Sequence, residues 1–404
     1  MSEERSLKPL SRLQKWVIAF SLVSMGVGMT ISFVVAPPLA RGAGLSELEV
    51  AGVLTGSAFL YALLTPVWGR WANQFGRKRV MVFALFMASV TNAMFILALS
   101  AAMRGVFLGL QAFFLLAIVR AAFGILASGL QPSAFAAMTD ATTSHDRAAG
   151  LGFLGAAMSV GSILGPTGAA ILARFGELAP LWGSVVFSLM ATAIVLFVLP
   201  RDESSRGRKR PKPLSMFDSR VRVFVIFMIL YFTAVGCMQQ TLAFYVEDRY
   251  GLQGAQSVEA AGWVFATMAI AMVLAQTFYV NRYKPRPLFM LPIGLTMVAG
   301  GYFLAIIHMP FWFLCGAYLI VGAGSALVVP SLNALCTLAV PIDDQGSAAA
   351  LMAMAPPAGF VIGPLIGGAV YMVHHDLPLT ISAVSMTALL AFALIKMGEK
   401  PVQA

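Results

Sequence analysis

Twelve long apolar stretches are the feature of this sequence that most restricts its fold. Each contains roughly the 20 predominantly apolar residues that an α-helix needs to cross a bilayer. They cover residues 15–37, 47–69, 80–102, 108–133, 148–173, 179–200, 221–246, 257–280, 287–307, 311–338, 347–373 and 378–396. Because the chain is 59% hydrophobic and only 11% charged, it does not have the composition of a soluble domain. We therefore predict an all-α membrane protein with twelve transmembrane helices.

The positions of lysine and arginine predict the orientation of these helices. With the N-terminus in the cytoplasm, 22 of the 27 basic residues fall in cytoplasmic segments, as the positive-inside rule requires. The outer loops then hold only Arg41, Arg104, Arg174 and Arg249. We expect a multi-pass protein of the bacterial inner membrane with both termini in the cytoplasm. Since this topology explains the net charge of +10, the charge does not indicate a nucleic-acid partner.

One long polar stretch divides the twelve segments into two sets of six. It covers residues 201–220 and reads RDESSRGRKRPKPLSMFDSR, a composition typical of a linker. The expected domains are an N-terminal six-helix bundle (1–200), the cytoplasmic linker (201–220) and a C-terminal six-helix bundle (221–404).

The two halves share a sequence pattern. A shift of 198 residues places Gly161 on Gly359 and Pro166 on Pro364. The halves are therefore predicted to be repeats that form two pseudo-symmetric bundles. Transporters built from repeats hold their substrates near the bilayer midplane, between the repeats.

Three motifs carry a family resemblance. Residues 69–79 (GRWANQFGRKR) follow the second segment, residues 120–132 (RAAFGILASGLQP) place an arginine inside the fourth, and residues 161–170 (GSILGPTGAA) lie in the fifth. In this order and spacing the chain resembles the major facilitator superfamily and, within it, the twelve-span drug/proton antiporters, which include tetracycline exporters. The resemblance implies two six-helix bundles around a central cavity and transport by alternating access.

The motifs depart from the family pattern at two places. The loop after the second segment has Asn73 where the family has an aspartate, and the fifth-segment motif ends in Ala169 and Ala170 where the family has glycines. The fuller match to the antiporter motif lies in the eleventh segment, GFVIGPLIGG, residues 359–368. Because asparagine carries no charge to oppose a helix dipole, we predict a weaker cytoplasmic latch than the family norm.

Glycines four residues apart in the fifth and eleventh segments share one helix face and allow another helix to approach closely. The proline inside each motif is expected to bend its helix. We interpret the pair as two bent helices that meet across the halves, along a seam on which the halves rock; pure packing explains the glycines equally well. The expected conformational residues are Gly69, Asn73, Gly76, Arg77, Gly161, Gly165, Pro166, Gly359, Gly363, Pro364, Gly367 and Gly368.

Arg120 is the most informative single residue, because a charge at helix-centre depth costs about 3 kcal/mol on insertion scales. Both a substrate-binding role and a structural role, with bonds to backbone carbonyls, are open. Gln131 lies three turns along the same predicted face, and Tyr318 is the equivalent position in the tenth segment. Ordinary packing is the simpler interpretation of each methionine among the binding candidates, which are Arg120, Gln131, Gln239, Gln240, Tyr231, Tyr318, Asn333, Met25, Met29 and Phe33.

Proton coupling usually needs a buried carboxylate, but the 17 acidic residues all fall in loops or at the ends of segments. Glu247 and Asp248, which close the seventh segment, are the proton-coupling candidates. Each fits a solvated helix end equally well. Alternatively, the substrate is an anion that Arg120 binds directly, and its charge supplies the coupling.

The sequence therefore predicts a secondary active transporter that exports a small amphipathic compound, either a drug or a secreted metabolite such as a siderophore, with proton coupling. The alternative is an importer or facilitator of a small organic anion bound by Arg120. An enzyme is not indicated, since no Ser/His, HExxH or nucleotide-loop pattern occurs. The expected partners are the small-molecule substrate, protons and the lipid bilayer. We expect a monomer with no cofactor and no metal.

Overall fold

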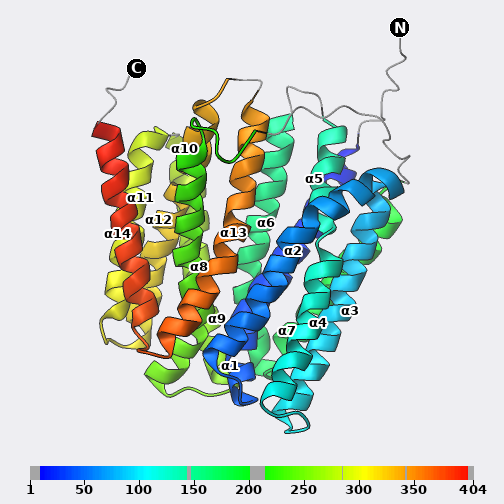
Figure 1. Ribbon diagram of the computed structural model, residues 1–404, viewed down its shortest axis with the longest axis vertical. Helices are drawn as coiled ribbons and strands as arrows, with labels where there is room; N and C mark the ends of the chain where they lie inside the picture. The colour runs from blue at the N-terminus through cyan, green and yellow to red at the C-terminus, as the bar shows by residue number, and fades with distance from the viewer. Residues whose placement is uncertain (1–9, 143–146, 201–213, 284, 342–343, 399–404) are drawn as a thin grey trace. The chain divides into compact units, whose positions relative to one another are not determined.

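The computed structural model describes residues 10–142, 147–200, 214–283, 285–341 and 344–398. Regular structure within these ranges is helical throughout (Figure 1). The described residues contain 12 candidate spans that are long and apolar enough to cross a membrane. The predicted fold class is confirmed, and each apolar stretch of the sequence corresponds to one span.

The first six spans consist of α1 (Arg12–Gly42), α2 (Glu47–Phe75), α3 (Arg77–Met103), α4 (Leu110–Ala127) with α5 (Leu130–Asp140), α6 (Arg147–Leu172) with the 3₁₀ turn η1 (Ala173–Phe175), and α7 (Ala179–Val198). The last six consist of α8 (Arg222–Tyr250), α9 (Ala255–Leu274) with η2 (Ala275–Val280) and α10 (Asn281–Tyr283), α11 (Pro287–Ile306), α12 (Phe311–Leu338), α13 (Gln345–Tyr371) and α14 (Leu377–Gly398).

The fourth span is interrupted between α4 and α5. Pro132 has no N–H to donate to the carbonyl of the residue four positions earlier, and a Cβ on Gly129 would lie 3.0 Å from the Trp68 ring. At the break, the Trp68 indole donates a 2.7 Å hydrogen bond to the Ile125 carbonyl. A neighbouring side chain thus satisfies a backbone group that the helix leaves free, as an apolar environment demands.

Two compact units divide the chain. The first comprises Met1–Val35 and Gly56–Arg210, and the second comprises Ala36–Thr55 and Pro211–Ala404. Residues 36–55, which we call the hairpin tip, contain the end of α1, the connecting turn and the start of α2. Both helices are therefore divided: the tip belongs to the second unit and the remainder to the first.

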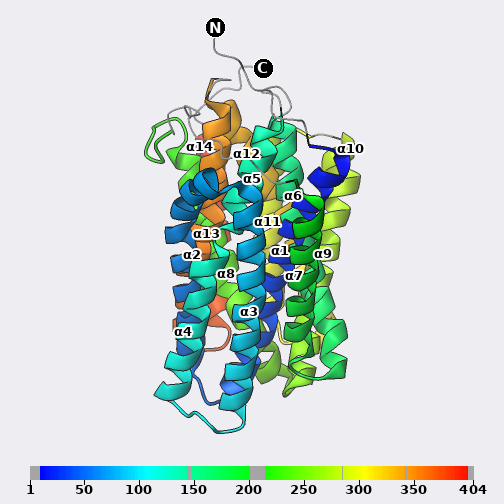
Figure 2. The same ribbon diagram turned by 90° about the vertical axis from the view of Figure 1, so that its right-hand side faces the viewer.

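In the first unit, α3 packs against α4, α5 and α7 (Figure 2). Its core contains Leu22 of α1, Met81 and Leu85 of α3, and Leu154 of α6, each at most 1% exposed. In the second unit, α13 lies along α8, and α11 lies between α12 and α14 (Figure 1). The core of the first unit is therefore built from residues of that unit.

Each of the two glycine faces packs within its own half. A Cβ on Gly161 of α6 would lie 3.0 Å from the Gly26 Cα of α1. A Cβ on Gly359 of α13 would lie 2.7 Å from the Phe232 Cβ of α8, and one on Gly363 would collide with the Thr233 carbonyl. The close approach that the spacing predicted is present, but our interpretation that the two faces meet across the halves is wrong. The fifth span packs on the first, and the eleventh packs on the seventh.

Candidate functional site

Arg120 is a buried cation without an acidic partner among the described residues. It lies on α4 and is 5% exposed. Its Nη1 donates a 3.0 Å hydrogen bond to Asn92 Oδ1 of α3, while its Nε has no hydrogen-bond partner. The guanidinium lies over two aromatic rings, 4.5 Å from the centre of Phe123 and 5.4 Å from that of Phe95. One neutral hydrogen bond and two cation–π contacts leave the positive charge without a counter-ion.

A small hollow lies beside this arginine. Asn92 and Phe123, which contact Arg120, line it together with Ser24 and Met25 of α1 and Ser188 of α7. Its volume is about 10 Å³, the size of one water molecule. The Ser24 hydroxyl is buried without a hydrogen-bond partner. The first unit therefore has a polar pocket that is nearly closed in this conformation.

Gln131 does not extend this site. The face that it was predicted to share with Arg120 assumed one continuous helix, but the chain breaks between α4 and α5. The Gln131 amide lies 3.7 Å from the sulfur of Met158 on α6. Of the first-span candidates, Met25 is 4% exposed, while Met29 and Phe33 are half-buried.

A second group of buried polar side chains lies in the second unit. The Tyr231 hydroxyl of α8 donates a 2.9 Å hydrogen bond to Ser325 of α12. Tyr318, also on α12, stands edge-on to Tyr302, and its hydroxyl has no partner. Gln240 is fully buried, and neither its amide nitrogen nor its amide oxygen is hydrogen-bonded. Buried polar groups normally have hydrogen-bond partners. Gln240 and Tyr318 are therefore positions where a polar ligand would supply the missing hydrogen bonds.

The other two binding candidates of the second unit are less enclosed. Gln239 is half-buried, and Asn333 on α12 is exposed. Their positions give no structural reason to prefer a binding role over an ordinary polar position.

The loop between α2 and α3 contacts α5. Gly76 precedes α3 with a φ of 98°, a conformation that favours glycine. Arg77 is 8% exposed and forms an ion pair with Asp140 at 3.0 Å. It also donates a hydrogen bond to Asn73 Oδ1. Asn73 therefore contacts the arginine, as the family's aspartate is expected to do, but without a charge.

A second ion-pair group lies just before α8. Arg220 contacts Asp218 at 2.8 Å and Asp344, the residue before α13, at 3.1 Å. Hydrogen bonds from the Arg220 side chain and backbone lower the pKa of Asp218 to about 2. Asp218 therefore remains charged at neutral pH.

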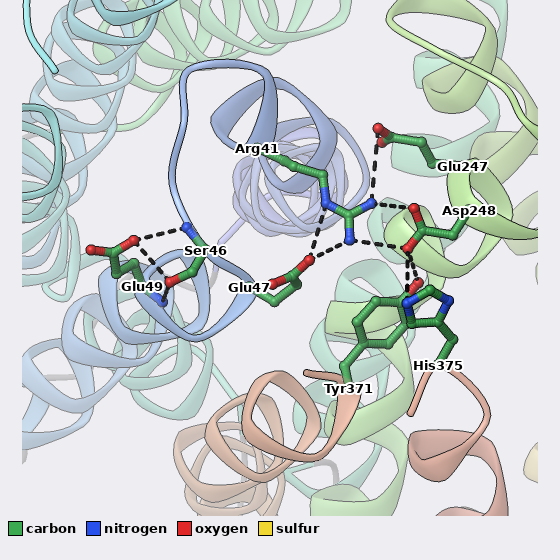
Figure 3. Close-up of polar contacts among 8 residues, drawn as sticks. All are labelled: Arg41, Ser46, Glu47, Glu49, Glu247, Asp248, Tyr371 and His375. Carbon is green, nitrogen blue, oxygen red and sulfur yellow. Dashed lines mark hydrogen bonds and ion pairs between the residues drawn. The ribbon is translucent and has the colours of Figure 1, made fainter. Parts of the chain in front are cut away.

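A polar network that draws on four helices surrounds Arg41 (Figure 3). Arg41, near the end of α1, contacts both carboxylate oxygens of Asp248 on α8, at 2.6 and 3.0 Å. Its Nε donates a 3.1 Å hydrogen bond to Glu47 of α2. The Tyr371 hydroxyl of α13 donates to Asp248 at 2.6 Å, and Glu247 lies 3.9 Å from Arg41. All these residues belong to the second unit.

Two neighbouring features complete this end of the second unit. Ser46 and Glu49 exchange side-chain and backbone hydrogen bonds of 2.8 and 3.3 Å at the start of α2, which is a capping box. A pocket of about 460 Å³ adjoins the network, lined by Tyr245, Asp248, Arg249, His308, Met372, Val373, His374, His375 and Asp376. Among the described residues, no three His, Cys, Asp or Glu side chains form a potential metal site.

Sequence reasoning identified Glu247 and Asp248 but missed Arg41, Glu47, Tyr371 and His375. The available signal was the scarcity of outer-loop arginines, since Arg41 is one of four. The residues that it pairs with are 6 and 207 positions away. Only the tertiary structure brings them together.

Twelve apolar spans in two repeated sets, each set enclosing polar groups without partners, define a membrane transporter built from repeats. The chain belongs to the Major Facilitator Superfamily, whose model matches residues 17–364 and 255–403. It is 24% identical over 405 residues to Multidrug resistance protein 1 of Bacillus subtilis (strain 168), with 97% of each chain covered. It is 25% identical to the class B Tetracycline resistance protein of Escherichia coli, with 89% of this chain and 87% of that protein covered.

Solved structures share the fold. A bacterial homologue of the human lysosomal transporter Spinster, in an inward-facing and occupied conformation, matches with a TM-score of 0.73 and 14% identity, covering 96% of this chain and 98% of that one. The nucleoside transporter NupG (D323A mutant) matches with a TM-score of 0.71 and 12% identity, covering 95% and 99%. The predicted family is confirmed, together with the similarity to drug-resistance proteins of this family.

Proposed function

We propose that this chain is an exporter of small amphipathic compounds, driven by protons and working by alternating access. The observation that carries the proposal is the similarity, over 97% of both chains, to a multidrug resistance protein, with a tetracycline resistance protein also among its relatives. The proposed location is a bacterial inner membrane with both termini in the cytoplasm, and the proposed assembly is a monomer.

Each unit has its own proposed binding region. In the first unit, Arg120 and the pocket beside it offer a cation, the Asn92 amide and one flexible methionine, Met25. In the second unit, Gln240 and Tyr318 offer unpartnered polar groups among aromatic rings. Aromatic and methionine surfaces adapt to varied apolar ligands, and a few polar groups fix their orientation.

The experiment is expression of the chain in a bacterium that lacks its own drug pumps. Cells that carry the chain are expected to accumulate less ethidium and tetracycline than cells with an empty vector, and a protonophore should abolish the difference. An Arg104→Gln variant is expected to lower accumulation as much as the wild-type chain does, because Arg104 is exposed beyond α3. Equal accumulation with and without the chain, for a broad panel of amphipathic compounds, would refute drug export.

A second candidate function is the import or facilitated passage of a small organic anion. The absence of an acidic partner for Arg120 among the described residues favours it, because a carboxylate would supply the missing counter-ion. Uptake of labelled monocarboxylates and dicarboxylates by the same cells separates the candidates. Faster uptake of an anion in cells that carry the chain would support the second candidate.

A further inference from the structure

The hairpin tip, residues 36–55, is held to the second unit by charge. Arg41 at the end of α1 forms a two-pronged contact with Asp248 of α8, at 2.6 and 3.0 Å. Glu47 at the start of α2 accepts a hydrogen bond from the same guanidinium. One arginine thus ties both helices of the hairpin to the end of α8 (Figure 3).

Helix α13 completes the arrangement. The Tyr371 hydroxyl donates a 2.6 Å hydrogen bond to Asp248. His375 stacks on the Tyr371 ring at 4.9 Å, and its Nε2 lies 3.8 Å from Asp248. The guanidinium of Arg41 also lies 4.7 Å from the centre of the Phe244 ring. Four helices therefore converge on one arginine–aspartate pair.

The backbone at this place fits as closely as the side chains do. A Cβ on Gly368 of α13 would lie 2.9 Å from the Glu47 carbonyl and 3.0 Å from the Ala51 Cβ. Glycine at this position lets α13 touch the start of α2 directly. The side-chain network therefore sits on a helix contact that is already tight.

This network matters because α1 and α2 are each divided between the two units. The tip belongs to the second unit, but the rest of both helices belongs to the first. Any movement that takes α1 and α2 away from α8 and α13 must break the contacts of Arg41. We propose that Arg41, Glu47, Asp248 and Tyr371 form a latch that closes this end of the transporter and opens once in every transport cycle. The proposal rests on the alternating access proposed above.

The latch has the properties that a reversible closure needs. The contact between Arg41 and Asp248 is charge-assisted and bidentate, which makes it stronger than an ordinary hydrogen bond. The three charged side chains of the latch, Arg41, Glu47 and Asp248, remain 17–24% exposed, so water replaces their lost partners when the latch opens. Such a contact stabilises the closed state and leaves the open state accessible.

Arg249 provides a matched control at the next position of α8. It donates hydrogen bonds to Tyr245 on its own helix and to the carbonyls of Ala305 and Ile307 at the end of α11. The two arginines carry the same charge at the same end of the second unit. Of the two, only Arg41 belongs to the hairpin tip.

The test is a distance measurement by pulsed electron paramagnetic resonance on the full-length chain in lipid nanodiscs. Spin labels are placed at Leu48 of the tip and Gln253 beyond α8, both exposed, after the three buried native cysteines are replaced by alanine. Wild type is expected to give a dominant short distance. Asp248→Asn and Arg41→Gln should raise the ratio of long to short distances by about fivefold to thirtyfold, whereas Arg249→Gln should leave it within about twofold.

Charge reversal provides the rescue. Arg41→Asp combined with Asp248→Arg should return the distribution toward wild type, which a merely misfolded variant would not do. An unchanged distribution in Asp248→Asn, or an equal shift in Arg249→Gln, would overturn the latch. No substrate is needed, so this result is independent of the export assay: distances that shift in a chain without transport activity would retain the latch and reject the exporter.

Discussion

At the scale of the residue, Arg120 is the side chain with the clearest unmet requirement. Its charge is buried, and a single amide and two aromatic rings contact it. Because a buried charge without a partner is a cost to the fold, we propose that Arg120 has a role in binding.

We predict that Arg120→Met leaves the thermal stability of the purified protein unchanged or higher while lowering transport by tenfold or more. The loss corresponds to one charge-assisted hydrogen bond to substrate, about 1.5–3 kcal/mol. Thermal unfolding in detergent and initial transport rates measure the two effects. A variant that unfolds at a lower temperature but transports normally when folded would identify Arg120 as structural.

Glu247 is the better proton-coupling candidate of the two acidic residues that close α8. Asp248 is occupied by Arg41 and Tyr371, whereas one carboxylate oxygen of Glu247 is buried with no hydrogen-bond donor. This free oxygen of Glu247 offers a place for a proton that does not require Arg41 or Tyr371 to leave.

We therefore predict that Glu247→Gln abolishes transport driven by a proton gradient but preserves exchange of labelled for unlabelled substrate. Glu259→Gln is the control and should keep driven transport. Glu259 also lies near one end of a span, in the first turns of α9, and it accepts a hydrogen bond from the Trp263 indole. Loss of exchange together with driven transport would show that Glu247 has a structural role.

At the residue scale, the sequence reveals a buried charge but not its partner. Arg120 is visible in the sequence because a lone charge interrupts an apolar run. Its partner Asn92 lies 28 residues away on another helix, and nothing local indicates the pairing. Arg41, Glu47 and Tyr371 were missed for the same reason, because an arginine near a loop is expected to be solvated unless the fold places a residue such as Asp248 beside it.

At the scale of the element, the glycine spacing predicted close helix contacts but not the partner helix. Spacing fixes which residues share a face, while the partner depends on the order of helices in each bundle. The break in the fourth span was missed too. Gly129 and Pro132 were its signals, but the apolar run through them favoured one continuous helix.

The packing of α13 on α8 leads to a prediction for stability. A Cβ at Gly363 would collide with the Thr233 backbone, whereas a Cβ at Gly300 of α11 would have nothing within 4 Å. Gly363→Ala should destabilise the protein by about 1–3 kcal/mol, because the helices must separate, and Gly300→Ala should change stability by less than about 0.5 kcal/mol. Thermal melts that show equal effects for both would contradict the packing argument.

The loop before α3 leads to a prediction for conformation. Asn73→Asp would give Arg77 a second carboxylate beside Asp140, and a charge-assisted bond is roughly twice as strong as a neutral one. We expect a higher outward-facing population, by about fivefold, in distances between spin labels at the exposed residues Gln74 and Ser219. Asn73→Ala, which removes the acceptor, should shift the population in the opposite direction; no change in either variant would contradict the prediction.

At the scale of the whole molecule, twelve spans and the repeat were predictable because membrane insertion imposes strict rules on length and composition. The division of α1 and α2 between the two units was not. It depends on which conformation the chain adopts, and a single sequence encodes every conformation of the cycle.

The central proposal is that this chain alone exports its substrate in exchange for protons. The most direct measurement is ethidium uptake by proteoliposomes that contain the purified protein, since the permanent charge of ethidium prevents passive trapping in an acidic lumen. We predict accumulation when the lumen is acidic, and none in liposomes without protein or after nigericin collapses the gradient. Accumulation of an organic anion with the gradient reversed, and no ethidium transport under either gradient, would contradict the exporter and establish the importer instead.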